Sequence, residues 1–277
     1  MNYTQVTFLL QPIDPWRDLL MVELGEIGYE SFEETTGGLH AYIPSSKFDP
    51  AALSRLLTLR DPHVSVNWTS IEIPGRNWNA EWERSFQPVE VGKDVRIRAD
   101  FHPHVEGFTH ELVITPRMAF GTGHHATTRM MVKAMLDLDL AAKRVCDLGC
   151  GTGVLAILAE RMDAATVDAI DIDQQAVDNA IDNVGRNGCT RIHVEKGVAT
   201  FLQGKVYDAI LANIERNTLL EAMQLMYDAL DHGGALLLSG FVVTDRHMLA
   251  QMARDTGFEL AERMNEGDWA LLGCRKP

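Results

Sequence analysis

The strongest chemical signal in the chain is a glycine-rich segment at residues 145–153, Val-Cys-Asp-Leu-Gly-Cys-Gly-Thr-Gly. Glycine has no Cβ, so its backbone adopts positive φ readily and a ligand can approach it closely. The helical run that follows, 154–159, would present free N–H groups to that ligand. A dinucleotide-binding turn has the spacing G-x-G-x-x-G, whereas Gly149, Gly151 and Gly153 alternate here. The spacing therefore predicts a ligand other than a pyrophosphate, and it disfavours a nicotinamide dehydrogenase.

A second acidic residue lies where a nucleoside would need it. The next predicted strand, 167–171, ends in Asp171, which follows Gly149 by 22 residues. A carboxylate at the tip of the second strand can accept two hydrogen bonds from ribose hydroxyls. We expect Asp171 in that role, and Asp173 as the N-cap of a helix over 174–186. A turn that binds nothing is the alternative, and the second acid disfavours it.

Residues 118–128 are another candidate ligand segment, between an apolar strand, 112–115, and a helix that begins near Thr127. Gly121 again permits close approach of a ligand to the backbone. The hydroxyl of Thr127 or Thr128 can donate from the helix N-terminus to a ligand carboxylate, or it can simply cap the helix.

The histidines of this segment, His124 and His125, do not predict a metal site. Adjacent histidines on a strand point to opposite faces, and no acid–histidine ligand motif accompanies them. The four cysteines lack the C-x-x-C spacing of zinc sites, so we expect small buried thiols.

The glycine segment resembles a known cofactor motif. Its pattern D-x-G-x-G-x-G, which Asp147 opens after a predicted strand, is similar to the first motif of the S-adenosylmethionine-dependent methyltransferases with a Rossmann-like fold. With Asp171 on the next strand, the resemblance implies S-adenosylmethionine as the cofactor.

A candidate catalytic residue, Asn213, ends the apolar run that begins at Tyr207. Methyl transfer to nitrogen is an in-line displacement, so the amine must arrive neutral with its lone pair aimed along the C–S axis. A side-chain carbonyl can hold an N–H and set that direction. The methyl donor already carries the reactive charge, so no strong general base is required. We predict that Asn213 positions the amine; a simple strand-end turn residue is the alternative.

Length and charge set limits on the function. A chain of 277 residues has room for two domains, and no apolar run reaches the length of a membrane span. The N-terminus lacks the features of a signal peptide, so we expect a cytoplasmic protein without membrane contact. A net charge of −14 argues against direct nucleic-acid binding and suits a basic partner. Residues 1–75 hold 10 acidic and 4 basic residues, the more acidic part per residue.

The first 75 residues predict a small α+β domain of order βαββαβ, which is the order of a ferredoxin-like fold. We expect its strands at 3–10, 29–35, 39–43 and 64–73, with a hairpin turn over 36–38. We expect helices at 16–27, with Asp14 as N-cap, and at 49–59, with Pro50 in the first turn.

Residues 76–100 are expected to form a linker, in which Trp78, Trp82 and Phe86 recur every four residues on one face of a short helix. Docking of that helix onto the second domain is favoured over a role in the substrate site.

Residues 101–277 then predict an α/β domain with a mainly parallel sheet of seven strands. Ligands in such sheets lie beyond the carboxyl ends of the strands, where Asp147, Asp171 and Asn213 all fall. We expect the strands at residues 144–148, 167–171, 191–195, 206–212, 234–239, 257–263 and 268–275.

Four segments together resemble the ribosomal protein L-eleven methyltransferase (PrmA) family over nearly the whole chain. The segments are residues 119–124, 147–153, 170–173 and 211–214. The resemblance implies trimethylation of lysine side chains and of the N-terminal amine of that ribosomal protein, with the N-terminal domain recognising the substrate. It also implies cofactor contacts by Thr128, Gly149, Asp171 and Asn213. From the same motifs we add Phe120, Gly121, Asp147 and Gly151 to the expected cofactor site.

Two alternatives stay open beside this expectation. The chain could methylate another protein or a small amine, although the N-terminal domain would then lack a purpose. It could also be a non-catalytic S-adenosylmethionine-binding module. Damage to the glycine turn or loss of Asn213 would have favoured that module, and neither is seen in the sequence.

Overall fold

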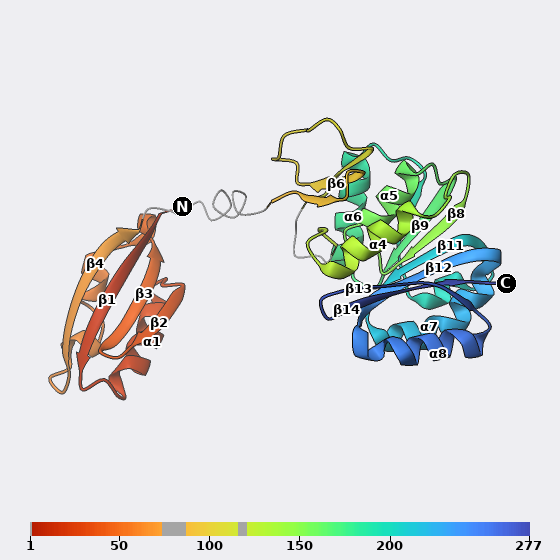
Figure 1. Ribbon diagram of the computed structural model, residues 1–277. Helices are drawn as coiled ribbons and strands as arrows, with labels where there is room; N and C mark the ends of the chain where they lie inside the picture. Colours follow the sequence, from red (N-terminus) through yellow and green to blue (C-terminus); the bar gives the residue numbers. More distant parts are fainter. Residues whose placement is uncertain (1, 74–86, 116–120) are drawn as a thin grey trace. The chain divides into compact units, whose positions relative to one another are not determined.

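A computed structural model describes residues 2–73, 87–115 and 121–277 of the chain (Figure 1). The chain divides into two compact units, residues 1–86 and 87–277, which are described separately below. The predicted helix face of Trp78, Trp82 and Phe86 lies outside the described residues.

In its described residues, 2–73, the first unit is a four-stranded antiparallel sheet with two α-helices, in the strand order β2-β3-β1-β4. This order and the sequence of elements are those of a ferredoxin-like domain, so the predicted fold is confirmed. The elements are β1 (Tyr3–Gln11), α1 (Trp16–Glu26), β2 (Ser31–Thr35), β3 (Gly38–Pro44), α2 (Pro50–Leu53) and β4 (Ser65–Ile73).

The core of this unit follows the two-residue period of its central strands. Alternate residues of β1, Val6 and Phe8 among them, are buried, and so are Leu39 and Ile43 of β3. They form one cluster with Leu20 and other apolar residues of the first unit. One face of the sheet is therefore covered, as a half-buried antiparallel sheet requires.

Two details of the first unit differ from the sequence prediction. The helix expected over 49–59 is only Pro50–Leu53, followed by a 3₁₀ turn at Thr58–Arg60. The carboxylate of Glu23, on α1, accepts hydrogen bonds from the backbone N–H groups of Leu57 and Thr58 at 2.9 and 3.1 Å. In a continuous helix these N–H groups would donate to backbone carbonyls of the preceding turn. Because they donate to Glu23 instead, the helix ends early.

The N-cap of α1 is also not the predicted residue. Pro15 occupies the cap position, and no side chain makes a capping hydrogen bond there. The carboxylate of Asp14 lies 3.6 Å from the guanidinium of Arg17 instead.

The second unit is built on a seven-stranded sheet in the order β10-β9-β8-β11-β12-β14-β13, with β14 antiparallel to both neighbours and the other pairings parallel. The predicted mainly parallel sheet is confirmed. Its strands are β8 (Arg144–Leu148), β9 (Thr166–Asp171), β10 (Ile192–Lys196), β11 (Tyr207–Asn213), β12 (Leu230–Val242), β13 (Glu259–Glu266) and β14 (Trp269–Arg275).

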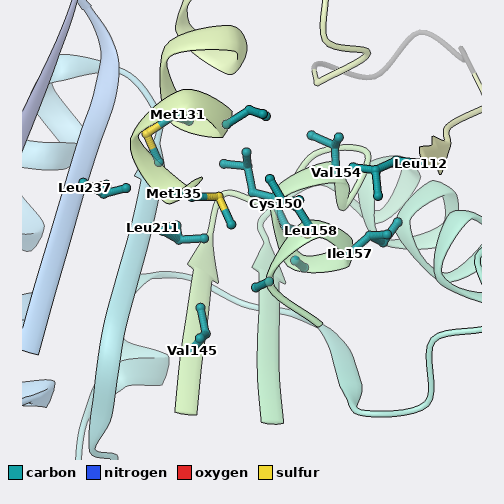
Figure 2. Packing of buried hydrophobic residues seen from close by; sticks show 14 of the residues in the cluster. Leu112, Met131, Met135, Val145, Cys150, Val154, Ile157, Leu158, Leu211 and Leu237 are labelled. Atoms are coloured by element: carbon teal, nitrogen blue, oxygen red, sulfur yellow. The ribbon is translucent and has the colours of Figure 1, made fainter. Parts of the chain in front are cut away.

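Helices cover both faces of this sheet, α4, α5 and α6 on one side and α7 and α8 on the other (Figure 1). Residues of β8 and β11 therefore alternate between two apolar clusters, and these central strands are buried along most of their length. Figure 2 shows Met135 of α4 close to Leu211 of the sheet, and both belong to the same apolar cluster as Met131 and Val145. The helices are α4 (Ala126–Leu136), α5 (Val154–Arg161), α6 (Gln174–Arg186), α7 (Arg216–Ala229) and α8 (Arg246–Thr256).

A three-stranded sheet precedes these elements, with β5 (Val89–Val91), β6 (Val95–Arg98) and β7 (His110–Val113) in the order β5-β6-β7. The first two strands lie within the segment expected as a linker, and Val89 and Ile97 join the core of the second unit. In the described part of the chain, no helix is long and apolar enough to cross a membrane.

Candidate functional site

The glycine segment forms a tight turn between β8 and α5. Gly149, Gly151 and Gly153 have φ of +77°, +54° and +77°, which lie in the left-handed region that favours glycine. The backbone N–H groups of Gly149 and Cys150 both donate to the carbonyl of Ile170, at 2.7 and 3.0 Å. The predicted strand, turn and helix are therefore confirmed, and the turn is tied to the end of β9.

Gly149 has a second reason to be glycine. A Cβ at this position would lie 2.0 Å from Cγ2 of Ile214, which follows Asn213. The turn after β8 and the end of β11 therefore lie so close together that only a residue without a side chain fits at position 149.

Asp171 is fixed at the tip of β9 by two backbone amides. One carboxylate oxygen accepts from the N–H of Gly151 at 2.8 Å, and the other accepts from the N–H of Asp173 at 3.0 Å. Each oxygen keeps a further lone pair for a ligand. Asp173 in turn accepts from the N–H of Gln175 at 3.0 Å, so its predicted role as the N-cap of α6 is confirmed.

The carboxyl edge of the sheet holds a cavity of about 470 Å³, which is within the usual range for a small-molecule site. Three predicted cofactor contacts from separate strand ends, Gly149, Asp171 and Asn213, meet there with Gly151. The full lining is Leu148, Gly149, Gly151, Ile170, Asp171, Ile172, Gly197, Val198, Ala199, Asn213, Ile214, Glu215 and Thr218.

Asn213 supplies an unpartnered acceptor to this cavity. It is the last residue of β11, and its register partner on β12 is Ser239. Its side-chain carbonyl oxygen, Oδ1, is buried and has no hydrogen-bond partner among the described residues. A buried carbonyl without a partner costs free energy, so this oxygen is suited to a donor from a ligand.

At the N-terminus of α4, the alternative interpretation, in which a threonine only caps the helix, does not hold. The N-cap is His125, whose ring Nδ1 accepts from the N–H of Thr127 at 3.3 Å and lies 2.7 Å from its hydroxyl. The Thr128 hydroxyl is buried and has no partner in the described part of the chain. Of the two candidates, the free hydroxyl therefore belongs to Thr128. Because the ring of His125 already caps the helix, neither threonine hydroxyl is needed as the cap.

The predicted contacts at 120 and 121 have different outcomes. Phe120 lies outside the described residues. Gly121 has a φ of +109°, and its carbonyl accepts from the Thr152 hydroxyl at 2.7 Å. The segment before α4 is thus attached directly to the glycine turn.

Asp147 lies beneath the turn and is not among the residues that line the cavity. It is fully buried, and Oδ2 accepts from the N–H of Ala156, in the first turn of α5, at 3.1 Å. Burial raises the pKa of Asp147 to about 7, and the nearby carboxylate of Asp171 adds to the shift, while the Ala156 amide opposes it. Its position supports the start of α5, which differs from the direct cofactor contact that we expected.

We expect Asp147 to make the stability of the unliganded protein fall between pH 5 and pH 7. The folded state keeps the proton up to about pH 7, whereas the unfolded chain releases it near 3.8, so rising pH favours unfolding. Asp147→Asn should remove this pH dependence. The free energy of unfolding of the variant minus that of the native protein should therefore rise by about 1.4 kcal/mol per pH unit. Urea unfolding of both proteins at pH 5, 6 and 7 measures this difference, and a difference that stays constant with pH would contradict the prediction.

Sequence reasoning missed a buried side chain that joins two parts of the site. Asn183, on α6, donates to the carbonyl of Thr152 at 2.9 Å and accepts from the N–H of Thr115 at 2.9 Å. It links the glycine turn to the exit of β7. The polar side chain on the buried face of an amphipathic helix was the available signal.

Two exposed apolar side chains at the cavity were also missed. Ile172 is 67% exposed and Val198 is 49% exposed, and both line the cavity. Val198 follows β10 closely, so the rule that ligands lie beyond the carboxyl ends of strands would have found it. Within the described residues, no group of three or more His, Cys, Asp or Glu side chains is arranged to hold a metal ion.

The sheet order, the glycine turn and the acid on the next strand define an S-adenosylmethionine-dependent methyltransferase of the Rossmann-like class. The family model for ribosomal protein L11 methyltransferases (PrmA) matches residues 21–277. The chain belongs to the ribosomal protein L11 methyltransferase (PrmA) family.

Individual relatives agree with this assignment. Ribosomal protein L11 methyltransferase of Phocaeicola vulgatus is 39% identical over 276 residues, which cover 98% of each chain. The protein of the same name from Porphyromonas gingivalis is 44% identical over 92% of this chain and 89% of its own. The crystal structure of ribosomal protein L11 methylase from Lactobacillus delbrueckii subsp. bulgaricus has a TM-score of 0.64 at 25% identity, and it covers 69% of this chain and 100% of that one.

The residues at the site fit the cofactor of this class. The cavity has the volume for a nucleoside, and the fixed carboxylate of Asp171 suits a ribose. Asn213 Oδ1, in the lining, has no hydrogen-bond partner among the described residues. The same holds for Thr128 Oγ1, although Thr128 is not among the residues that line the cavity.

Proposed function

We propose that the chain transfers methyl groups from S-adenosylmethionine to amines of ribosomal protein L11, both lysine side chains and the N-terminal amine. The relatives named for this substrate align over nearly the whole chain, the first unit included. The observation that carries the amine chemistry is the unpartnered carbonyl of Asn213 at the cavity. Because ribosomal proteins are made and assembled in the cytoplasm, we place the protein there.

We assign the cofactor contacts as follows. The Asp171 carboxylate accepts hydrogen bonds from the ribose, and the backbone of Gly149 and Gly151 lies against the ligand. The apolar side chains of Ile172 and Val198, which are exposed at the cavity, cover the base. The N–H groups at the start of α4 and the Thr128 hydroxyl bind the carboxylate, because the N-terminus of a helix favours an anion.

Catalysis then rests on positioning. When bound, S-adenosylmethionine supplies a methyl group on a positively charged sulfur, so the acceptor needs only a free lone pair. Asn213 Oδ1 accepts one N–H of a neutral primary or secondary amine and directs its lone pair toward the methyl group. An amine that still holds its extra proton cannot react, so the proton is lost to solvent before the transfer.

We assign substrate recognition to the first 75 residues. They carry a net charge of −6, with 10 acidic and 4 basic residues. A negatively charged surface attracts a lysine-rich protein. This attraction raises the association rate more than it raises the affinity of the complex.

Incubation with methyl-labelled S-adenosylmethionine and recombinant ribosomal protein L11 tests the function, with mass spectrometry to locate the label. We expect label on lysine side chains and on the N-terminal amine. Absence of label with the cofactor demonstrably bound would overturn the substrate assignment. Label on another component of a ribosomal-protein mixture or on a small amine would instead identify the substrate as that molecule.

Asp171→Ala should weaken S-adenosylmethionine binding by about 1–3 kcal/mol, the scale for hydrogen bonds to a charged group. Titration calorimetry measures the change. The matched control is Asp173→Ala, which removes only the cap of α6 and should lower stability by about 0.5–2 kcal/mol while affinity is kept. Native affinity in Asp171→Ala would remove this carboxylate from the site.

A further inference from the structure

The N-terminus of α4 is attached to the hairpin between β13 and β14 at two points. The ring of His125 lies edge-to-face against the ring of Trp269, with centroids 4.5 Å apart. One turn further along α4, the Nε of Arg129 donates to the carboxylate of Glu266 at 2.8 Å. Glu266 ends β13 and Trp269 begins β14, so both contacts reach the tip of the hairpin.

These contacts lie at the same edge of the sheet as the cofactor cavity. Trp269 pairs with Val242, which is the last residue of β12, so the hairpin tip is at the carboxyl end of that strand. Asn213 ends the neighbouring parallel strand β11. The buried Thr128 hydroxyl, which has no partner among the described residues, is three residues after His125 on α4.

His125 can cap the helix in only one protonation state. Its Nδ1 accepts from the N–H of Thr127, so the proton of the neutral ring must be on Nε2. A protonated ring carries hydrogens on both nitrogens and can accept from neither. Histidine is not among the residues usually preferred at an N-cap. With histidine at this position, the capping hydrogen bond of α4 depends on pH.

We propose that His125 is a positioning residue for the methyl donor: its neutral imidazole caps α4 and packs against Trp269, and so fixes the turn of helix that binds the donor's carboxylate. The inference rests on the proposed function, in particular on the assignment of Thr128 and the α4 N-terminus to that carboxylate. Protonation of His125 then removes the cap and weakens cofactor binding.

The charges around the ring favour the neutral form. Burial lowers the pKa of His125 below its ordinary 6.5, and the Arg129 guanidinium on the same helix lowers it further, while Glu266 on the hairpin opposes both. The capped state is therefore fully formed above pH 6.5 and is lost as pH falls through the lowered pKa. Asp147 also titrates in this range, so the contribution of His125 is the part of the pH dependence that His125→Asn removes.

The test is titration calorimetry of S-adenosylmethionine into the full chain between pH 8 and pH 5. We expect the affinity of the native protein to fall about tenfold over this range, the size of a lost cap. His125→Asn keeps a side-chain acceptor that does not titrate, so its affinity should stay near the native pH 8 value throughout. His125→Ala should bind about tenfold more weakly at every pH. The exposed His247, on α8, gives the control His247→Asn, which should retain the native pH profile.

The outcomes separate this inference from the function on which it rests. No binding by the native protein at pH 8 would overturn the proposed function, and the inference with it. If the native protein binds S-adenosylmethionine at pH 8 and His125→Asn loses affinity toward pH 5 as the native protein does, this result would overturn the inference alone. A native profile that is flat down to pH 5 would do the same. If His125→Ala does not fold, the native and asparagine profiles still decide the matter.

Discussion

Asn213→Ala is expected to lower kcat for methylation of ribosomal protein L11 by about 10²-fold, the scale of a reacting group displaced by 1 Å. The side-chain carbonyl is buried, has no partner among the described residues and lies at the cavity. Its removal leaves the amine free to rotate away from the methyl group. Affinity for the cofactor should change by less than about tenfold, because at most one neutral hydrogen bond is lost. Initial rates at saturating substrates and cofactor titration measure the two effects separately.

Two further variants define the origin of this effect. Asn213→Gln keeps the carbonyl but moves it by one methylene, so we expect it to be nearly as slow as the alanine variant. Asn217→Ala, at an exposed position in the first turn of α7, should keep the native rate. A native kcat in Asn213→Ala would exclude Asn213 as the residue that orients the amine.

Gly149→Ala should impair both folding and cofactor binding. The positive φ alone costs about 1–2 kcal/mol for a residue with a Cβ. The new methyl would also lie 2.0 Å from Ile214 Cγ2, so Ile214 must move, and overpacking of this kind costs about 1–3 kcal/mol. Because Ile214 lines the cavity, we expect cofactor affinity to fall by at least about tenfold. Urea unfolding and calorimetric titration measure the two losses.

Gly188→Ala is the matched control for the crowding. Gly188 has a φ of +64°, and among the described residues nothing lies within 4 Å of the position its Cβ would take. This variant should show only the backbone cost and keep native cofactor affinity. Equal losses of stability in the two variants, with affinity kept in both, would show that the contact with Ile214 has no consequence.

Local sequence signals predicted those elements whose ends are set by their own residues. The bounds of α6 were predicted because Asp173 caps it from the adjacent position. The helix expected over 49–59 was wrong because Glu23, more than thirty residues earlier, occupies the amides of Leu57 and Thr58. No local pattern reveals an acceptor that arrives from another helix.

The same distinction holds for the site. Asp171 and Asn213 end their strands, and the rule for parallel sheets brings such positions to one edge, where both line the cavity. The role of His125 could not be predicted from the sequence His-His-Ala-Thr-Thr at 124–128, because it depends on the ring's contacts with Thr127 and Trp269. Asp147 belongs to the glycine motif, yet its depth beneath the turn depends on the packing of α5.

The two amides that hold Asp171 have a consequence for turnover. The carboxylate is already oriented before a ligand arrives, so little conformational freedom is lost when it binds a ribose. That ribose is the same in the methyl donor and in the demethylated molecule that remains after transfer. The oriented carboxylate of Asp171 therefore binds the ribose of the demethylated molecule as strongly as that of S-adenosylmethionine. We therefore expect the demethylated molecule to compete with S-adenosylmethionine for the site and to slow turnover as it accumulates.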